Sequence, residues 1–345
     1  MLVAVVLISL TLLSANVSAD VERVKYQAEG NYLIVEVLDD DLIHFEYGRG
    51  PGPNTDKTIE TTDMICKKTD NLPQGICKPL SDFTGPETFS DNDAGVLETK
   101  DIRLHINTSN LFATMIDTTK NNLSLTTIRA ENLHQDRKRL VCTRSERLDV
   151  YGLGQQFIEP GRMDIDWDRR VREGGEFGNV MAGFNSGANG NTQIPVMYAV
   201  NEATFENYAL LLDNIYRQRW DFTSSSQWQV EVNEGQIRFF LMTGPDFLDL
   251  RKDYMELVGR PLVPPKKMFG LWISEYGYDD WHELEDKLRT LQEKKFPVDG
   301  FVLDLQWFGG IKANSDNTRM GALTFDEVKF PNPSQKISEL KMIKV

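Results

Sequence analysis

The sequence predicts a mixed fold in two parts: an antiparallel β-sandwich, then the first two β/α units of a (β/α)8 barrel. Short runs of alternating apolar residues, separated by turn residues, fill the first two thirds of the chain. From residue 265 onward, two apolar strands flank one amphipathic helix. A barrel needs eight such units, and the sequence ends about 40 residues after the second strand, so we expect an incomplete barrel.

Residues 1–19 are typical of a secretory signal. An apolar run, too short to span a bilayer, is followed by the small residues of ANVSA. The segment carries no Lys or Arg, so a buried amino-terminal strand is the alternative. We therefore expect a secreted or periplasmic protein without a membrane span.

The chain is acidic throughout, with 38 basic and 52 acidic residues and a formal net charge of −14. This charge opposes binding to polyanions, so we expect no nucleic-acid partner. The length suits about two domains. The sequence leaves the oligomeric state open.

Three cysteines are present. Cys66 and Cys77 could close a short loop if their geometry allows, which would leave Cys142 over. The odd number leaves the disulfide state open.

Residues 20–245 show the pattern of antiparallel hairpins. The expected strands are residues 31–37, 42–48, 101–106, 111–116, 207–214, 228–233 and 236–242. Residues 48–94 are rich in Gly, Pro, Thr and Asp and predict an irregular excursion. Together these features predict a β-sandwich.

Residues 246–264 are expected to form a helix and a linker. Pro245 suits the first helical position, and Gly259 suits the position just past the end. The predicted apolar stripe consists of Phe247, Leu250, Tyr254 and Leu257. The prolines that follow predict an extended linker.

Residues 265–345 are expected to open the barrel. The runs 268–274 and 300–305 are apolar without strict alternation, as strands covered on both faces are. Between them lies a helix that Asp279 or Asp280 can cap and Pro297 ends, with a stripe of Trp281, Leu284, Leu288 and Leu291. A second helix is expected after Ser334 as its cap.

Asp304 stands at the far end of the second strand. Barrel enzymes hold ligands at the carboxyl ends of their strands, so this position predicts a ligand-facing carboxylate. The alternative is a turn or cap carboxylate.

Other motifs do not predict a metal or a cofactor. Asp164, Asp166 and Asp168 imitate a calcium loop, but Arg169 and Gly175 stand where that loop needs Gly and Glu. The four histidines lie far apart, without metal-ligand spacing. The glycine-rich run 173–191 lacks the Lys of a phosphate-binding loop.

Four separated motifs, in order, resemble glycoside hydrolase family 31. They are YGLGQQ at 151–156, the run 243–274, DGFVLDLQWF at 299–308 and the run 323–341. The resemblance covers residues 150–345. One departure is Gln155, where the family usually has Glu.

The resemblance implies a galactose-mutarotase-like sandwich followed by a barrel, and a retaining α-glycosidase of the α-glucosidase type. The substrate would be an α-linked gluco-oligosaccharide, with α-xylosides used by some members. The alternatives are an oligosaccharide 4-α-glucosyltransferase and a non-catalytic carbohydrate-binding fragment. No cofactor is implied.

The resemblance also places both catalytic aspartates on later barrel strands, so we expect no catalytic residue in this chain and no activity from it alone. It gives Asp304 the role of binding hydroxyls of the terminal sugar. Three aromatic residues at or beyond the strand ends are candidates to wall a sugar subsite, with core packing equally open: Trp272, Tyr278 and Trp307.

Overall fold

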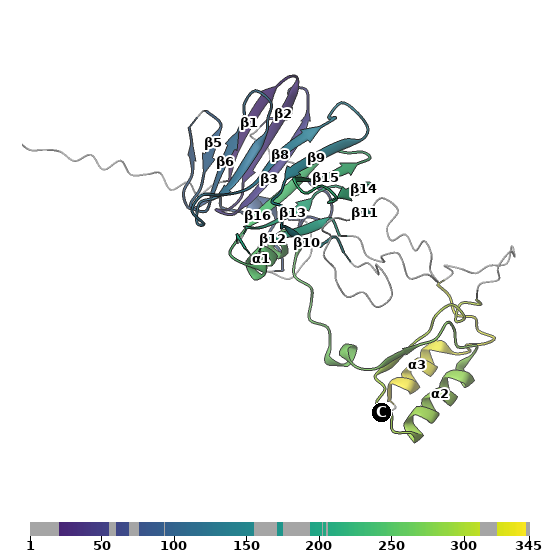
Figure 1. Ribbon diagram of the computed structural model, residues 1–345. Helices are drawn as coiled ribbons and strands as arrows, with labels where there is room; N and C mark the ends of the chain where they lie inside the picture. Colours follow the sequence, from purple (N-terminus) through teal and green to yellow (C-terminus); the bar gives the residue numbers. More distant parts are fainter. Residues whose placement is uncertain are drawn as a thin grey trace, which may run out of the picture. The chain divides into compact units, whose positions relative to one another are not determined.

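The computed structural model separates into two compact units, residues 1–260 and residues 261–345 (Figure 1). The described residues are 21–54, 60–68, 76–92, 94–154, 171–174, 194–201, 203–204, 206–310 and 323–342. The predicted signal segment, the acidic motif at 164–168 and Gln155 lie outside them, as does almost all of the glycine-rich run.

The first unit contains two antiparallel sheets. One has the strand order β1-β2-β3-β16-β13-β12-β10. Its strands are β1 (Glu22–Ala28), β2 (Asn31–Val37), β3 (Leu42–Arg49), β10 (Asp149–Gly152), β12 (Val196–Asn201), β13 (Glu206–Leu212) and β16 (Ile237–Thr243). We call it the first sheet.

The second sheet has the order β11-β14-β15-β9-β8-β7-β6-β5-β4. Its strands are β4 (Ser90–Asp91), β5 (Val96–Glu98), β6 (Ile102–Ile106), β7 (Ala113–Asp117), β8 (Leu123–Glu131), β9 (Lys138–Thr143), β11 (Val171–Gly174), β14 (Gln218–Asp221) and β15 (Gln227–Val232). The predicted antiparallel strands are confirmed.

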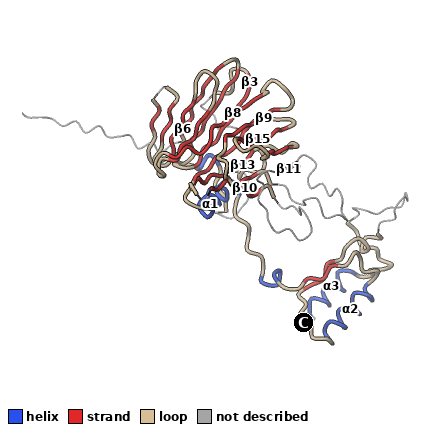
Figure 2. The backbone as a smooth tube through the Cα atoms, viewed as in Figure 1, coloured by secondary structure: helices blue, strands red, loops and turns tan. Residues whose placement is uncertain are grey.

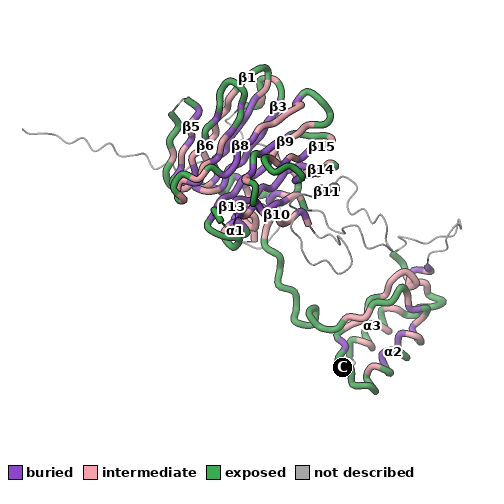
Figure 3. The backbone as a smooth tube through the Cα atoms, in the orientation of Figure 1, coloured by how far each residue is buried: buried purple, intermediate pink, exposed green. Residues whose placement is uncertain are grey.

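The two sheets share one hydrophobic core (Figure 3). Alternation explains which side chains enter it: Ile102, Leu104 and Ile106 of β6 are buried, whereas the residues between them are not. Trp228 of β15 donates its indole N–H to the Tyr208 hydroxyl of β13 at 2.9 Å. This bond links the two sheets through the middle of the core.

Helix α1 (Phe247–Val258) covers the other face of the first sheet, where a second apolar cluster forms. Leu250 and Leu257 are buried as predicted, but Phe247 is 45% exposed. The expected start at Pro245 is wrong. The helix begins two residues later because the Asp246 side chain accepts the N–H groups of the first turn.

A disulfide joins Cys66 and Cys77, and the Cys142 thiol is buried. The segments beside the disulfide hold the end of α1. Cys66 N–H donates to Leu257 O and Lys78 N–H to Glu256 O, both at 2.8 Å. A short 3-10 helix follows at Leu80–Asp82. The described parts of the irregular segment thus hold the carboxyl-terminal end of α1 through backbone hydrogen bonds.

The second unit contains η2 (Lys266–Phe269), β17 (Trp272–Ser274), α2 (Trp281–Glu293), β18 (Gly300–Val302) and α3 (Pro333–Met342), shown in Figure 2. β17 and β18 pair in parallel, as predicted, and Asp280 caps α2. None of the helices in the described residues is long and apolar enough to cross a membrane.

Two expectations for this unit are wrong. The first strand is shorter than residues 268–274, because Pro265 leads into a 3-10 turn that takes up residues 266–269. Ser334 does not cap the last helix, since α3 already begins at Pro333. Proline suits a first helical position because the missing N–H has no partner there.

Removing the disulfide should destabilise the first unit. We expect the double variant Cys66→Ser, Cys77→Ser to lose about 2 to 3 kcal/mol of unfolding free energy, since a short closed loop restricts the unfolded chain by about that much. Urea unfolding measures the loss. A reductant should lower the melting temperature of the unchanged chain but not that of the variant, and equal sensitivity would contradict the prediction.

The β17–β18 pair should not tolerate a side chain at Gly300. An added Cβ there would lie 2.3 Å from Cζ3 in the six-membered ring of Trp272, which is on the paired strand. We expect Gly300→Ala to cost about 1 to 3 kcal/mol in urea unfolding followed by tryptophan fluorescence. The cost should shrink in a Trp272→Val background, and an undiminished cost would show that the ring is not the obstacle.

Candidate functional site

The candidate site is the edge of the second unit where the two parallel strands end. Parallel strands bring their carboxyl ends to one edge. The loop after β17 and the loop after β18 both start there, and they approach closely. A Cβ added to Gly277 of the first loop would lie 2.2 Å from Cγ of Gln306 in the second.

Asp304 lies in the loop just after β18 and is half-buried. Its carboxylate makes no hydrogen bond or ion pair with any other described residue. Asp299 stands just before the same strand, and its carboxylate accepts the Leu271 N–H at 3.1 Å. The two aspartates therefore differ. The Asp299 carboxylate already accepts a backbone hydrogen bond, whereas the Asp304 carboxylate is available to a ligand.

Tyr278 lies in the loop after β17, but it is a core residue. It is 1% exposed, and its ring meets Phe301 edge-on at 5.8 Å. Its hydroxyl has no hydrogen-bond partner among the described residues, and burial raises its pKa. The ring packs in the apolar cluster with Trp281 and Phe330.

Trp307 follows Asp304 in the loop after β18 and is half-buried. Its ring lies 4.9 Å from that of Phe325 and 5.3 Å from that of Phe308. Its carbonyl accepts the Asp326 N–H at 2.8 Å. Trp307 thus ties the loop to residues 323–330 while keeping part of its surface open.

Trp272 is not at a carboxyl strand end, which corrects the predicted position. It is the first residue of β17 and pairs with Gly300, the first residue of β18. Its indole donates to Lys267 O at 2.8 Å and lines a hollow with Leu284 of α2 and Leu340 of α3. Asp304, Tyr278 and Trp307 share one edge, and Trp272 lies at the opposite end.

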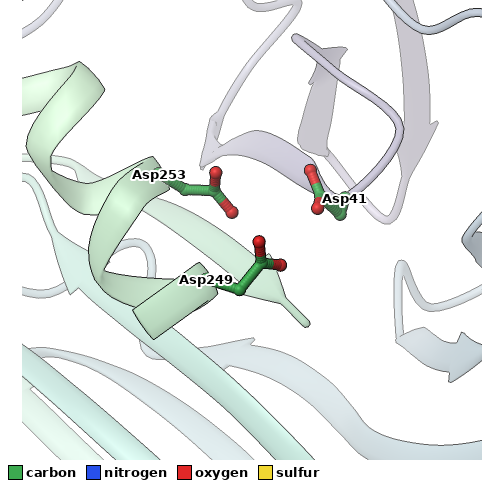
Figure 4. Close-up of side chains that lie close together, drawn as sticks. All are labelled: Asp41, Asp249 and Asp253. Atoms are coloured by element: carbon green, nitrogen blue, oxygen red, sulfur yellow. The ribbon is translucent and has the colours of Figure 1, made fainter. Parts of the chain in front are cut away.

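A second cluster of functional groups lies in the first unit and was not predicted. Asp41, after the turn that follows β2, meets Asp249 and Asp253 of α1 (Figure 4). The spacing of four residues on one helix was a readable signal for the last two. Asp41 lies much earlier in the chain, and no local sequence pattern indicated that it would join them.

The carboxyl-terminal part of the chain matches a known domain. Residues 261–345 match the domain described as the glycosyl hydrolases family 31 TIM-barrel domain. The Alpha-glucosidase 2 of Bacillus thermoamyloliquefaciens is 30% identical over 135 residues, which are 39% of this chain and 16% of that protein. An Alpha-xylosidase of Saccharolobus solfataricus is 28% identical over 151 residues, 44% of this chain and 19% of that protein.

Solved structures agree in fold. The GH31 dextranase of Flavobacterium johnsoniae, complexed with isomaltotriose, superposes with a TM-score of 0.70 at 13% identity. The match covers 95% of this chain and 37% of the dextranase. A GH31 alpha-xylosidase from a soil metagenome, complexed with xylose, gives 0.68 at 14% identity, covering 93% and 44%.

This chain thus spans less than half the length of the relatives and structures it matches. The domain match covers the part of the chain where the parallel strand pair lies, and the fold matches extend over both units. Residues 261–345 therefore match the TIM-barrel domain of the family 31 glycoside hydrolases, and the chain is similar in sequence to an Alpha-glucosidase and an Alpha-xylosidase.

Proposed function

We propose that the protein is a retaining, exo-acting α-glycosidase of the α-glucosidase type, acting on α-linked gluco-oligosaccharides. The first unit would be the sandwich that precedes the barrel, and residues 265–345 would supply the first barrel strands. The relative named as an Alpha-glucosidase supports a glucoside substrate, and the relative named as an Alpha-xylosidase supports action on α-glycosides in general.

One observation carries the proposal: the carboxylate of Asp304 stands at the carboxyl edge of a parallel strand pair. In barrel enzymes this edge holds the substrate. The carboxylate has no partner among the described residues, so it can accept hydrogen bonds from sugar hydroxyls, which are strong when the acceptor is charged. Trp307 next to it offers a partly open aromatic face.

Asp304 is proposed as a substrate-binding group and not as the nucleophile. Retention requires two carboxyl groups about 5 to 5.5 Å apart, one attacking and one acting as acid and then base. We assign neither to the described residues. The resemblance places both on later barrel strands, so we propose that these 345 residues alone do not turn over an aryl α-glucoside.

Glucosyl transfer is the second candidate. The Cycloalternan-forming enzyme of Listeria monocytogenes, solved with a pentasaccharide substrate, superposes with a TM-score of 0.61 at 14% identity. Hydrolysis and transfer share the glycosyl-enzyme intermediate and differ in whether water or a sugar accepts it. With maltotriose and an active enzyme, free glucose indicates hydrolysis, and maltotetraose indicates transfer.

We also propose export, so that the enzyme would meet oligosaccharides in the periplasm or outside the cell. The support is the pattern of residues 1–19. Amino-terminal sequencing of the protein from its own host tests this, since export by cleavage leaves Asp20 as the first residue.

Asp304→Asn should weaken sugar binding. The substitution keeps the side-chain size and removes the charge, so we expect the dissociation constant for maltotriose to rise about 10- to 100-fold in calorimetry. The matched control is Asp299→Asn, at the other end of the same strand, where an amide oxygen can still accept the Leu271 N–H. Equal affinities in the two variants would contradict the proposed site.

Tyr278 should act through packing. Its hydroxyl is buried without a partner among the described residues, so we expect Tyr278→Phe to keep or slightly raise the unfolding free energy. Tyr278→Ala should cost about 3 to 5 kcal/mol. Weakened maltotriose binding in Tyr278→Phe, with stability unchanged, would instead give the hydroxyl a role in the sugar site.

A further inference from the structure

Three carboxylates from two distant segments meet on the first unit. Asp41 comes from the chain between β2 and β3, and Asp249 and Asp253 come from α1. One oxygen of each lies within 4.8 Å of the others. Figure 4 shows the three carboxylates turned toward one common space.

Asp253 faces this space from a buried position. The residue is 4% exposed, and its Oδ2 has no hydrogen-bond partner among the described residues. Its other oxygen lies 3.8 Å from Nζ of Lys252, whose side chain is 57% exposed. Burying a carboxylate oxygen without a hydrogen-bond donor costs free energy. A bound proton or cation at this oxygen would offset that cost.

The local charge is strongly negative. Burial, followed by the charges of Asp39 and Asp249, raises the pKa of Asp41 to about 7. Burial, followed by the charge of Asp41, raises the pKa of Asp253 to about 8. The positive charge of Lys252 opposes these shifts, because it lowers the pKa of both Asp41 and Asp253.

Asp101 and Glu256 add to the negative field. Asp101 acts on Asp41, and Glu256 acts on Asp253. Lys100 opposes the charge of Asp101, and Lys252 opposes those of Asp41 and Asp253. The three clustered carboxylates still lie close enough to repel one another, and a bound cation would relieve this repulsion.

We propose that Asp41, Asp249 and Asp253 form a binding site for a divalent cation of the hard, oxygen-preferring class, with Ca2+ as the best fit. The site supplies carboxylate oxygens only, and it has no nitrogen or sulfur ligand that would favour a transition metal. Ca2+ binds oxygen at about 2.3 to 2.6 Å, so ligands on opposite sides of it can lie about 5 Å apart. The three oxygens, which all lie within 4.8 Å of one another, fall inside this span.

The smaller Mg2+ makes stricter demands on its ligands. Its bonds of about 2.0 to 2.1 Å need ligands closer together and near-octahedral geometry. Asp41 and Asp249 are half-buried, so water can complete the coordination of the larger ion. The site would join α1 to the chain between β2 and β3.

The test uses the full chain, stripped with a chelator and then titrated with CaCl2 at pH 8. We expect one site per chain by calorimetry. At about 100 times the dissociation constant, the melting temperature should rise by on the order of 5 °C. Asp253→Asn should lose both signals, and Glu256→Gln should keep them because it removes the same charge from the same helix outside the cluster.

The pH dependence gives a second readout. Both pKa values lie above the ordinary 3.8, so without cation stability falls as pH rises from about 4 to 8 and then levels off. Bound Ca2+ should reduce this fall, because it holds the carboxylates ionised. Its affinity should increase from pH 6 to 8 as protons cease to compete.

Several outcomes would overturn the site. They are no calorimetric or thermal response to 10 mM CaCl2, a response that survives in Asp253→Asn, and a pH dependence that Ca2+ leaves unchanged. The last would show a cluster that holds protons only. Should Asp253→Asn fail to fold, Asp41→Asn replaces it, since that residue lies outside any helix.

Discussion

The first sheet is buried on both faces, and this constraint governs the first unit. One face closes on the second sheet, and the other is covered by α1 and the disulfide-bonded segment. Polar side chains on the covered face must therefore find partners within the protein. Glu36 meets His44 at 2.8 Å and also pairs with Arg23. Although burial raises the pKa of Glu36, these two partners outweigh it and leave the pKa below its usual range. Asp213 likewise accepts both the N–H and the hydroxyl of Thr62.

The same constraint explains how α1 is held against the first sheet. Its apolar residues cover the first sheet, but its polar edge faces the chain after β2, where Asp41 lies. The carboxyl-terminal half is fixed by backbone hydrogen bonds to the segments on either side of the disulfide. Asp249 in the first turn and Asp253 near the middle of the helix meet Asp41, and these carboxylates repel unless something neutralises them. One helix thus carries both a stretch fixed by backbone hydrogen bonds and a group of like charges.

Local patterns predicted most of the elements, because period-two and period-3.6 repeats are written in neighbouring residues. The strands around Leu104, the stripe of α2 and the parallel pair are examples. The errors came from competition at element ends. Asp246 capped α1 in preference to a start at Pro245, and a 3-10 turn shortened the first barrel strand, which left Trp272 at its beginning. The acidic cluster was missed because it depends on tertiary contact between distant segments, which no local pattern encodes.

The site at the end of β18 depends on how firmly its loop is held. The strands there are short, so pairing alone fixes little of the backbone. Three other contacts restrict it: the close approach of Gly277 to Gln306, the bond from Asp326 N–H to Trp307 O, and the Trp281 indole bound to Pro331 O at 3.0 Å. None of these contacts engages the carboxylate of Asp304. A carboxylate on a restricted loop, without a partner among the described residues, would need little reorganisation to accept the proposed sugar hydroxyl, and this is how preorganisation lowers the cost of binding.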